Sequence, residues 1–289
     1  MLGAIAGDIC GAPWEGGSCP KERLKLFSLE AGITDDTVCT LAIAQALLSG
    51  LDPVTTLREW VARYPGVGYG AAFHRWAHSQ SGPYGSASNG SCMRVSALGL
   101  LAESLEQSDA WAEASAVITH NHIDSVHAAC AISGAIFLAR TGTSPRQMRQ
   151  ILAARYGYDL SPSVDDLIAD YRYSPLAAET APRAIICALE ATSWEDAVRN
   201  AIAVGGDTDT LACMAGGIAE ARFGMPREHA QKALTYLSTE MVQVLTSLYD
   251  QAGLGRPWEL AEPVGGSSKK MTKTRVDRRI VSWLQNLFG

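Results

Sequence analysis

Two short acidic segments have the residue types and spacing that most directly suggest chemistry. The first is Thr34-Asp35-Asp36-Thr37, and the second is Gly205-Gly206-Asp207-Thr208-Asp209-Thr210. Each precedes an apolar stretch with helical periodicity, so each is expected on a turn at a helix N-terminus. Helix capping explains either segment alone, because Asp and Thr side chains accept hydrogen bonds from the first N–H groups of a helix. A cap needs only one side-chain oxygen, however, and each turn offers at least three oxygen-bearing side chains within four residues.

The two segments together suggest a metal site if their turns face each other. Four carboxylates would then converge, and like charges about 4 Å apart repel by about 4 kcal/mol at intermediate dielectric. Divalent cations remove this repulsion. Ligation by oxygen alone, with no histidine or cysteine nearby, selects a hard ion such as Mg²⁺ or Mn²⁺, with Ca²⁺ a weaker candidate. Two such ions would make a bridging water a good nucleophile near neutral pH.

A third acidic segment, Gly7 to Glu15, contains a glycine-rich turn that ends in Glu15. One interpretation is the end of an N-terminal helix followed by a solvated glutamate. The other is a carboxylate that lies over the metals as a base or as a group that orients the substrate.

Residues 60–102 contain no acidic side chain, although the chain as a whole is acidic. This stretch has two glycine-rich turns, 66–70 and 85–91, and the basic residues Arg63, His74, Arg75, His78 and Arg94. Small residues ahead of a helix expose backbone N–H groups, and the helix dipole there favours a phosphate. A plain turn is the alternative.

The histidines do not form a convincing metal site. His74 and His78 have the i,i+4 spacing of zinc ligands but no acid or third ligand nearby, which favours a helix face. His120 lies in the polar loop Thr119-His120-Asn121-His122. We expect it to form a hydrogen bond to a ligand hydroxyl or phosphate.

The elements that must position these residues are helices. Apolar residues recur at three and four positions, and no stretch keeps a period of two, so a β-sheet core is not expected. The expected helices cover residues 37–48, 53–63, 94–105, 109–118, 124–139, 145–155, 179–191, 194–203, 209–222, 227–236 and 240–251. Pro175, Pro182 and an Asp/Ser cluster at 159–166 indicate an irregular mid-chain loop. We predict one all-α domain over residues 1–255.

Composition excludes several classes of protein. With 47% apolar residues among 289, the chain is not mostly disordered. No apolar run approaches the roughly 18 residues of a membrane span, and the apolar start lacks the basic leader of a secretory signal. Seven scattered cysteines without a C-x-x-C pair argue against disulfides and zinc, and they favour a reducing cytoplasm.

The charge is divided unevenly along the chain. Residues 1–264 carry a net charge of −11, whereas residues 265–289 carry +5. The stretch 256–274 has the Gly, Pro and Ser content of a flexible linker. Residues 275–289 form a basic tail in which Val276, Ile280, Trp283, Leu284 and Leu287 would share one face of a short helix. We expect this tail to pack on the acidic body, with nucleic acid or a membrane surface as the alternative partner.

Several segments together resemble one known family, the ADP-ribosylglycohydrolases related to dinitrogenase-reductase-activating glycohydrolase. The matching segments are GDICGAPWE (7–15), TDDT (34–37), PGVGYG (65–70), SNGSCMRV (88–95), ITHNH (118–122) and AVGGDTDTLACMAGGIAEA (203–221). They extend over residues 1–225, and the last is long and specific. Val67 and Ile123 depart from the residues usual at the substrate rim and leave the target preference open.

The resemblance implies an orthogonal all-α fold with a binuclear Mg²⁺ or Mn²⁺ centre. The implied metal ligands are Thr34, Asp35, Asp36, Asp207, Asp209 and Thr210. The implied catalytic carboxylates are Glu15, Asp36 and Asp207. ADP-ribose would be held by Gly68, Tyr69, Gly70, Asn89, Gly90, Ser91 and His120. All of the metal positions are present, which argues against an inactive relative.

The implied activity is hydrolysis at ribose C1″ of ADP-ribose attached to a protein side chain or a small molecule. Arginine, with an N-glycosidic bond, is the first choice of acceptor, and O-linked serine or O-acetyl-ADP-ribose is the second. The competing hypothesis is a non-catalytic ADP-ribose- or nucleotide-binding module with a regulatory or immunity role.

Overall fold

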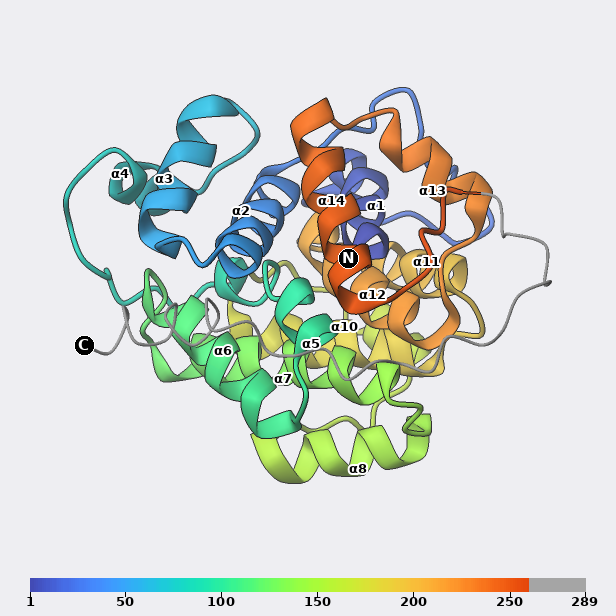
Figure 1. Ribbon diagram of the computed structural model, residues 1–289. Coiled ribbons are helices and arrows are strands. Elements are labelled where there is room, and N and C mark those ends of the chain that lie inside the picture. The colour runs from blue at the N-terminus through green and yellow to red at the C-terminus, as the bar shows by residue number, and fades with distance from the viewer. Residues whose placement is uncertain (260–289) are drawn as a thin grey trace.

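The computed structural model describes residues 1–259, and helices form almost all of its regular structure (Figure 1). The α-helices are α1 (Leu2–Gly11), α2 (Asp35–Ser49), α3 (Pro53–Arg63), α4 (Ala71–Ala77), α5 (Ser96–Leu101), α6 (Leu105–Val117), α7 (Ile123–Arg140), α8 (Pro145–Tyr156), α9 (Val164–Ala169), α10 (Ala177–Glu190), α11 (Trp194–Val204), α12 (Thr208–Phe223), α13 (Arg227–Leu234) and α14 (Thr239–Ala252). Two 3-10 turns lie at Ala12–Trp14 and Asn89–Ser91. Over residues 1–259, β pairing is limited to two isolated bridges, which confirms the all-α prediction.

Helix α1 packs along α12 at backbone contact distance because glycines line the interface. Gly3, Gly7 and Gly11 are spaced four residues apart and therefore share one face of α1. A Cβ on Gly7 would collide with the carbonyl of Ala212, and a Cβ on Gly3 would lie 2.7 Å from the Gly216 carbonyl oxygen. This close approach brings the C-terminal end of α1 beside the N-terminal end of α12.

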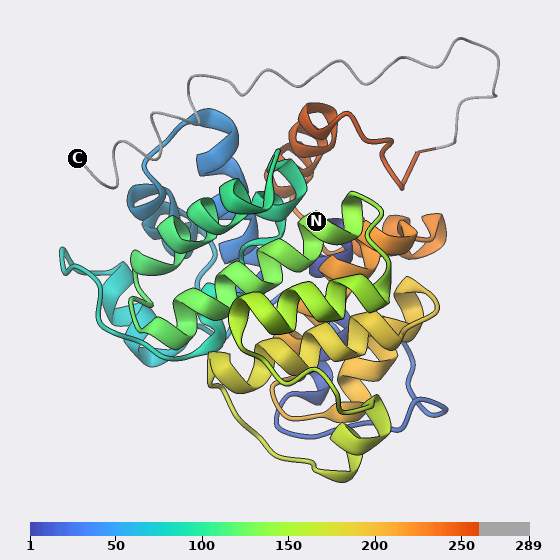
Figure 2. The ribbon, with the colours of Figure 1, turned by 90° about the horizontal axis from the view of Figure 1, so that it is seen from below.

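The remaining helices surround this pair. In Figure 2 helices α6, α7, α8 and α10 lie side by side, and α7 also contacts α5 and α12. Helix α7 is long and apolar enough to span a membrane by composition, but 67% of it is buried inside the fold. Its apolar residues are therefore accounted for by packing against its neighbours.

Some local expectations were wrong. The helix expected at 94–105 is interrupted, because Ser104 caps α6 by accepting a hydrogen bond from the Gln107 N–H, and the chain is extended at Ala102. Pro182 does not mark a loop but lies inside α10. The carbonyl that it leaves without a helical partner belongs to Ala178, which is exposed, so water can satisfy it.

Two short helices, α4 and α9, were not expected, whereas α1 matches the N-terminal helix that was one interpretation of the segment Gly7 to Glu15. Helix α9 lies within the segment assigned to the irregular loop, and a capping box at Ser163 and Asp166 begins it. The predicted tail, 275–289, and most of the linker, 256–274, lie outside the described residues. The domain boundary at residue 255 therefore stays a prediction.

Candidate active site

The two acidic turns meet in one cavity of about 410 Å³. The lining includes Thr34, Asp35 and Asp36 from the start of α2 and Asp207, Asp209 and Thr210 from the start of α12. Glu15 lines the same cavity. The convergence that the metal hypothesis required is therefore present.

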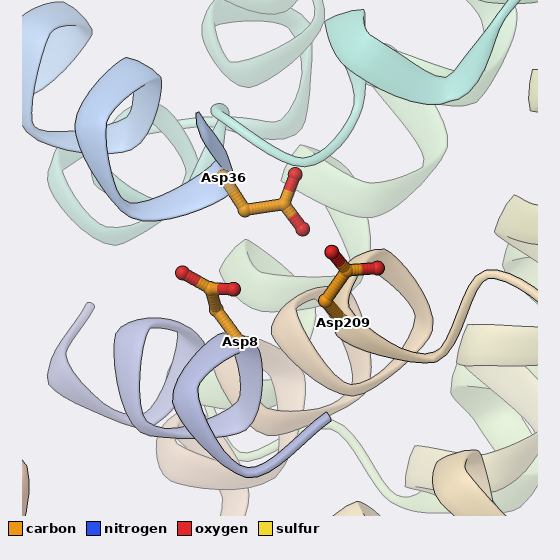
Figure 3. A group of neighbouring side chains, drawn as sticks. All are labelled: Asp8, Asp36 and Asp209. Carbon is orange, nitrogen blue, oxygen red and sulfur yellow. The ribbon is translucent and has the colours of Figure 1, made fainter. Parts of the chain in front are cut away.

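Asp8 adds a carboxylate to which the sequence analysis gave no role. Figure 3 shows the carboxylates of Asp8, Asp36 and Asp209 turned toward one another from α1, α2 and α12. One oxygen from each lies within 4.8 Å of the other two, and all three residues are buried. Asp8 reaches this position because the glycines of α1 allow its close contact with α12.

Asp8 also fixes the start of α2. Its carboxylate accepts hydrogen bonds from the backbone N–H and hydroxyl of Thr34, at 3.0 and 2.7 Å, and from the same two groups of Thr37. The Thr34 oxygen in turn accepts a hydrogen bond from the Asp36 N–H at 3.2 Å. Since its proton is donated to Asp8, Thr34 Oγ1 keeps one lone pair for a cation in the cavity.

Glu15, Asp207 and Asp209 form a second group of oxygens that lie within 4.8 Å of one another. Backbone hydrogen bonds hold the Glu15 loop against the Asp207 turn: Gly16 donates to the Gly206 carbonyl and Gly206 donates to the Gly17 carbonyl, both at 2.8 Å. Gly206 has φ +94°, a conformation that a residue with a side chain rarely adopts. Glu15 itself is exposed at the edge of the cavity.

A residue distant in sequence also supports the Glu15 loop. The Tyr171 hydroxyl donates to the Gly16 carbonyl oxygen at 3.0 Å. Tyr173, two residues further, lines the cavity. Burial, together with Asp207 and Glu15, raises the pKa of the Tyr173 phenol.

Without cations the acidic cluster resists ionisation. Burial raises the pKa of Asp8 to about 6, and burial together with Asp8 raises the pKa of Asp35 to about 7. Burial and the facing Asp209 carboxylate hold the pKa of Asp36 well above its ordinary value. Burial also raises the pKa of Glu15, with the Asp207 charge as a second cause. The ionised carboxylates of the site therefore need more positive charge nearby than the side chains of the protein provide.

The donor set fits divalent cations. The Oδ2 atom of Asp36 is buried and has no hydrogen-bond partner among residues 1–259. An unsatisfied buried carboxylate oxygen is costly, and a metal ion satisfies it. The surrounding donors are carboxylate and hydroxyl oxygens, which hard ions such as Mg²⁺ and Mn²⁺ prefer. Asp8 is occupied by its four donors, so it serves as a support for the ligands on α2.

The other end of the cavity has a different character. Its lining includes Gly70, Ser86, Ser88, Asn89, Gly90, Arg94 and His120. Gly68 also lines the cavity, but it lies beside the acidic turn of α2, because a Cβ there would be 3.6 Å from Asp35 Oδ1. Backbone N–H groups and hydroxyls are hydrogen-bond donors, and donors suit an anionic group. Asn89 joins the two ends, because its side-chain amide donates to Asp207 Oδ2 at 2.8 Å.

Two residues that the resemblance assigned to ADP-ribose lie outside this lining. The Tyr69 hydroxyl donates to the Tyr64 carbonyl, and its ring packs beside Phe73. The Ser91 hydroxyl is buried and donates to the Ser125 carbonyl at 3.0 Å. Both side chains support loops that contribute neighbouring residues to the cavity.

One sequence signal points to Asp8. Glycines at every fourth position of an apolar stretch indicate a helix that packs closely on another, and Asp8 follows the middle one directly. No comparable signal marked Tyr171 or Tyr173, which reach the site from a loop more than 150 residues away from Glu15.

Comparisons with known proteins identify the family of this chain. A sequence model of the ADP-ribosylglycohydrolase family matches residues 1–256. The chain is 26% identical to the mouse protein "ADP-ribosylhydrolase ARH3" over 78% of this chain and 83% of the mouse protein. It is also 26% identical to the human protein of the same name over 72% of this chain and 76% of that protein.

A solved structure shares the fold. It is described as an "ADP-ribosylglycohydrolase-related protein complex" and superimposes with a TM-score of 0.64 at 24% identity. The match covers 87% of this chain and 97% of the other. With a family match over nearly all of the described residues, the chain belongs to the ADP-ribosylglycohydrolase family.

Proposed function

We propose that this protein is a metal-dependent hydrolase that releases ADP-ribose from a conjugate by cleaving the bond at ribose C1″. The observation that carries the proposal is the pairing of a buried carboxylate cluster, with an unsatisfied Asp36 oxygen, and a donor-rich pocket in the same cavity. The first suits cations and the second suits a diphosphate. In ADP-ribose, the ribose would lie at the carboxylate cluster and the diphosphate would lie in the donor-rich pocket.

Two Mg²⁺ or Mn²⁺ ions, when bound, would supply charge that polarises the ribose hydroxyls and a nearby water. Thr34, Asp35 and Asp36 would hold one side of the centre, and Asp207, Asp209 and Thr210 would hold the other.

Several residues of the chain have their own roles. Glu15 lies at the edge of the cavity with a raised pKa, which suits a carboxylate that exchanges a proton with water or with the leaving group. Asp36 and Asp207 are the other carboxylates that we place at the reacting end, and Asn89 orients Asp207 through its amide. The donor-rich part of the cavity would fix the diphosphate, so that the reacting carbon is presented to the acidic part.

Arginine is our first choice of acceptor. Glu15 lines the cavity and is exposed to solvent, so its carboxylate, when ionised, can attract a cation there. A guanidinium leaving group is cationic and suits that edge. An O-linked serine conjugate or O-acetyl-ADP-ribose is the second choice, because the edge of the cavity, not the metal ligands, decides the acceptor.

The test is release of ADP-ribose from proteins modified on arginine and, separately, on serine, first with Mg²⁺ and then with excess EDTA. We expect release that stops with EDTA and is faster from the arginine conjugate. Faster release from serine would reverse the acceptor choice. Binding of ADP-ribose by folded protein, without metal-dependent release from either conjugate, would favour the alternative, a non-catalytic regulatory or immunity module.

The cellular setting stays a prediction. All seven cysteines are free and buried, which is compatible with the cytoplasmic location that we propose. The basic tail lies outside the described residues, so its contacts with the acidic body, nucleic acid or a membrane are open to experiment.

A further inference from the structure

Arg94 is a buried cation with no carboxylate beside it. The residue is 0% exposed. Its Nη2 donates to the Ser115 carbonyl at 2.6 Å and to Thr119 Oγ1 at 2.9 Å, and its Nε lies 3.4 Å from Ser115 Oγ. Nη1 has no partner among residues 1–259. A buried charge without a counter-charge is costly, so Arg94 calls for an explanation.

Arg94 begins a chain of hydrogen bonds that ends in the donor-rich part of the cavity. Thr119 Oγ1 lies 2.6 Å from His120 Nδ1, and His120 Nε2 lies 3.0 Å from Ser88 Oγ. Ser88 Oγ lies 2.9 Å from Ser86 Oγ. Thr119 and His120 are buried, and His120, Ser88 and Ser86 line the cavity.

The direction of this chain follows from donor and acceptor counts. A guanidinium only donates, so Thr119 Oγ1 accepts from Arg94 and still has one proton to donate. Among residues 1–259, the remaining acceptor bonded to that hydroxyl is His120 Nδ1. Nδ1 is therefore without a proton, and the neutral ring has its proton on Nε2. That proton is donated to Ser88, whose own hydroxyl proton is then free for Ser86 or for a ligand.

The His120 ring is held in place, so this direction does not depend on a mobile side chain. A Cβ on Gly90 would lie 2.9 Å from His120 Nε2, which shows how closely the ring packs on that backbone. Tyr84 packs on the ring with centroids 5.7 Å apart. Burial, with the Arg94 charge as a second cause, lowers the pKa of His120 to about 3, so the ring is neutral at neutral pH.

We propose that Arg94 is a positioning residue: through Thr119 it holds His120 as the Nε2–H tautomer and thereby makes Ser88 a hydrogen-bond donor to an anionic group of the ligand. The proposal rests on the proposed function only in taking ADP-ribose as that ligand. Arg94 does not touch the ligand in this account. It acts by setting the direction of three successive hydrogen bonds.

The first measurement is the tautomer of His120 in the metal-free, ligand-free full chain with isotope-labelled histidine. Long-range proton–nitrogen correlation spectra distinguish a protonated from an unprotonated ring nitrogen, and the His120 signals are assigned by their loss in His120→Gln. We expect Nε2 protonated and Nδ1 unprotonated in the wild type and in Thr119→Ser. Thr119→Val removes the donor, and we expect it to shift His120 toward Nδ1–H. A wild-type ring protonated on Nδ1 would overturn the proposal.

The second measurement is binding of free ADP-ribose by calorimetry. Thr119→Val should weaken binding about tenfold, the usual effect of losing one hydrogen bond to a charged group, and Thr119→Ser should restore it. Ser88→Ala should weaken binding by a similar factor, and the double variant should lose no more than either single variant. Two outcomes would refute the role of Ser88. One is that the losses of ADP-ribose affinity in the two single variants add up in the double variant. The other is that Thr119→Val alters the His120 tautomer but leaves ADP-ribose binding unchanged.

A matched control separates positioning from loss of stability. Thr40 is also buried, and its hydroxyl donates to the Met93 carbonyl at 3.1 Å, outside the chain of hydrogen bonds. Thr40→Val should lower the unfolding temperature as much as Thr119→Val does and leave both the tautomer and ADP-ribose affinity unchanged. The tautomer of His120 is measured without ligand and without turnover. If the protein released no ADP-ribose, that result would therefore contradict the proposed function but not the proposed role of Arg94.

Discussion

Without divalent cations, the free energy of unfolding of this protein should fall as the pH rises from about 4 to about 7. Two carboxyls of the site have raised native-state pKa values, about 6 for Asp8 and about 7 for Asp35, against 3.8 ordinarily. Between these limits the native state binds more protons than the unfolded chain. The free energy of unfolding therefore decreases with rising pH, the opposite of the usual behaviour of salt-bridged carboxylates.

The expected magnitude is a large fraction of the stability of a typical domain, which is about 5–15 kcal/mol. A pKa of about 6 in place of 3.8 for Asp8 corresponds to about 3 kcal/mol of unfolding free energy, and the value for Asp35 corresponds to about 4 kcal/mol. The two groups interact, so these contributions do not add fully. Bound metal favours the ionised carboxylates and therefore reverses the decrease of the unfolding free energy with pH. A cation at about one hundred times its dissociation constant adds roughly 3 kcal/mol to the free energy of unfolding.

The assay is urea unfolding across this pH range in EDTA and in saturating Mg²⁺. We expect the midpoint in EDTA to fall with pH and the midpoint in Mg²⁺ to stay level or rise. Asp209→Asn should raise the metal-free midpoint at neutral pH and remove the response to Mg²⁺. Asp165→Asn, which changes an exposed carboxylate on α9, should behave as the wild type. A metal-free stability that rises with pH, or an equal Mg²⁺ response in Asp209→Asn, would refute the reasoning.

Four further predictions concern residues around the site and the C-terminal tail. Glu15→Gln should slow ADP-ribose release about a hundredfold in steady-state kinetics, with metal binding retained in calorimetry; an unchanged rate would exclude Glu15 from proton transfer. Tyr171→Phe removes the hydrogen bond to the Gly16 carbonyl and should lower kcat several-fold with an unchanged unfolding temperature. Gly7→Ala should force α1 away from α12 and cost about 3 kcal/mol in urea unfolding, with weaker metal binding. Deleting 265–289 should leave the release rate intact; failure to fold would show that the tail belongs to the domain.

Local sequence patterns predicted where the helices of the site begin, because a helix start depends on residues that are close together in the sequence. Thr34 and Asp207 occupy the N-cap positions of α2 and α12, where the Asp/Thr segments predicted helix starts. The Thr34 side chain accepts a cap hydrogen bond from the Asp36 N–H, whereas the Asp207 side chain accepts none. A capping pattern specifies where a helix begins, but not which helix ends meet. Their meeting depends on the close contact of α1 with α12, which is a tertiary property carried by small residues at spacing four.

The parts that were missed depend on contacts between distant segments or on very short helices. Helices α4 and α9 have seven and six residues, too few for a periodic pattern to stand out from a loop. Arg94 was expected as part of a basic, anion-binding stretch, but it is buried and acts on neutral partners. Its connection to Thr119 spans 25 residues, and no spacing rule predicts the direction of a hydrogen-bond chain.

The central proposal is that the carboxylates of α2 and α12 hold two catalytic cations. The most direct test is to measure bound Mn²⁺ per chain and the rate of ADP-ribose release in the same samples across a chelator titration. The account predicts that the rate follows occupancy of a two-ion site and vanishes in the metal-free protein, which remains folded by circular dichroism. Release at the full rate from metal-free protein would contradict it.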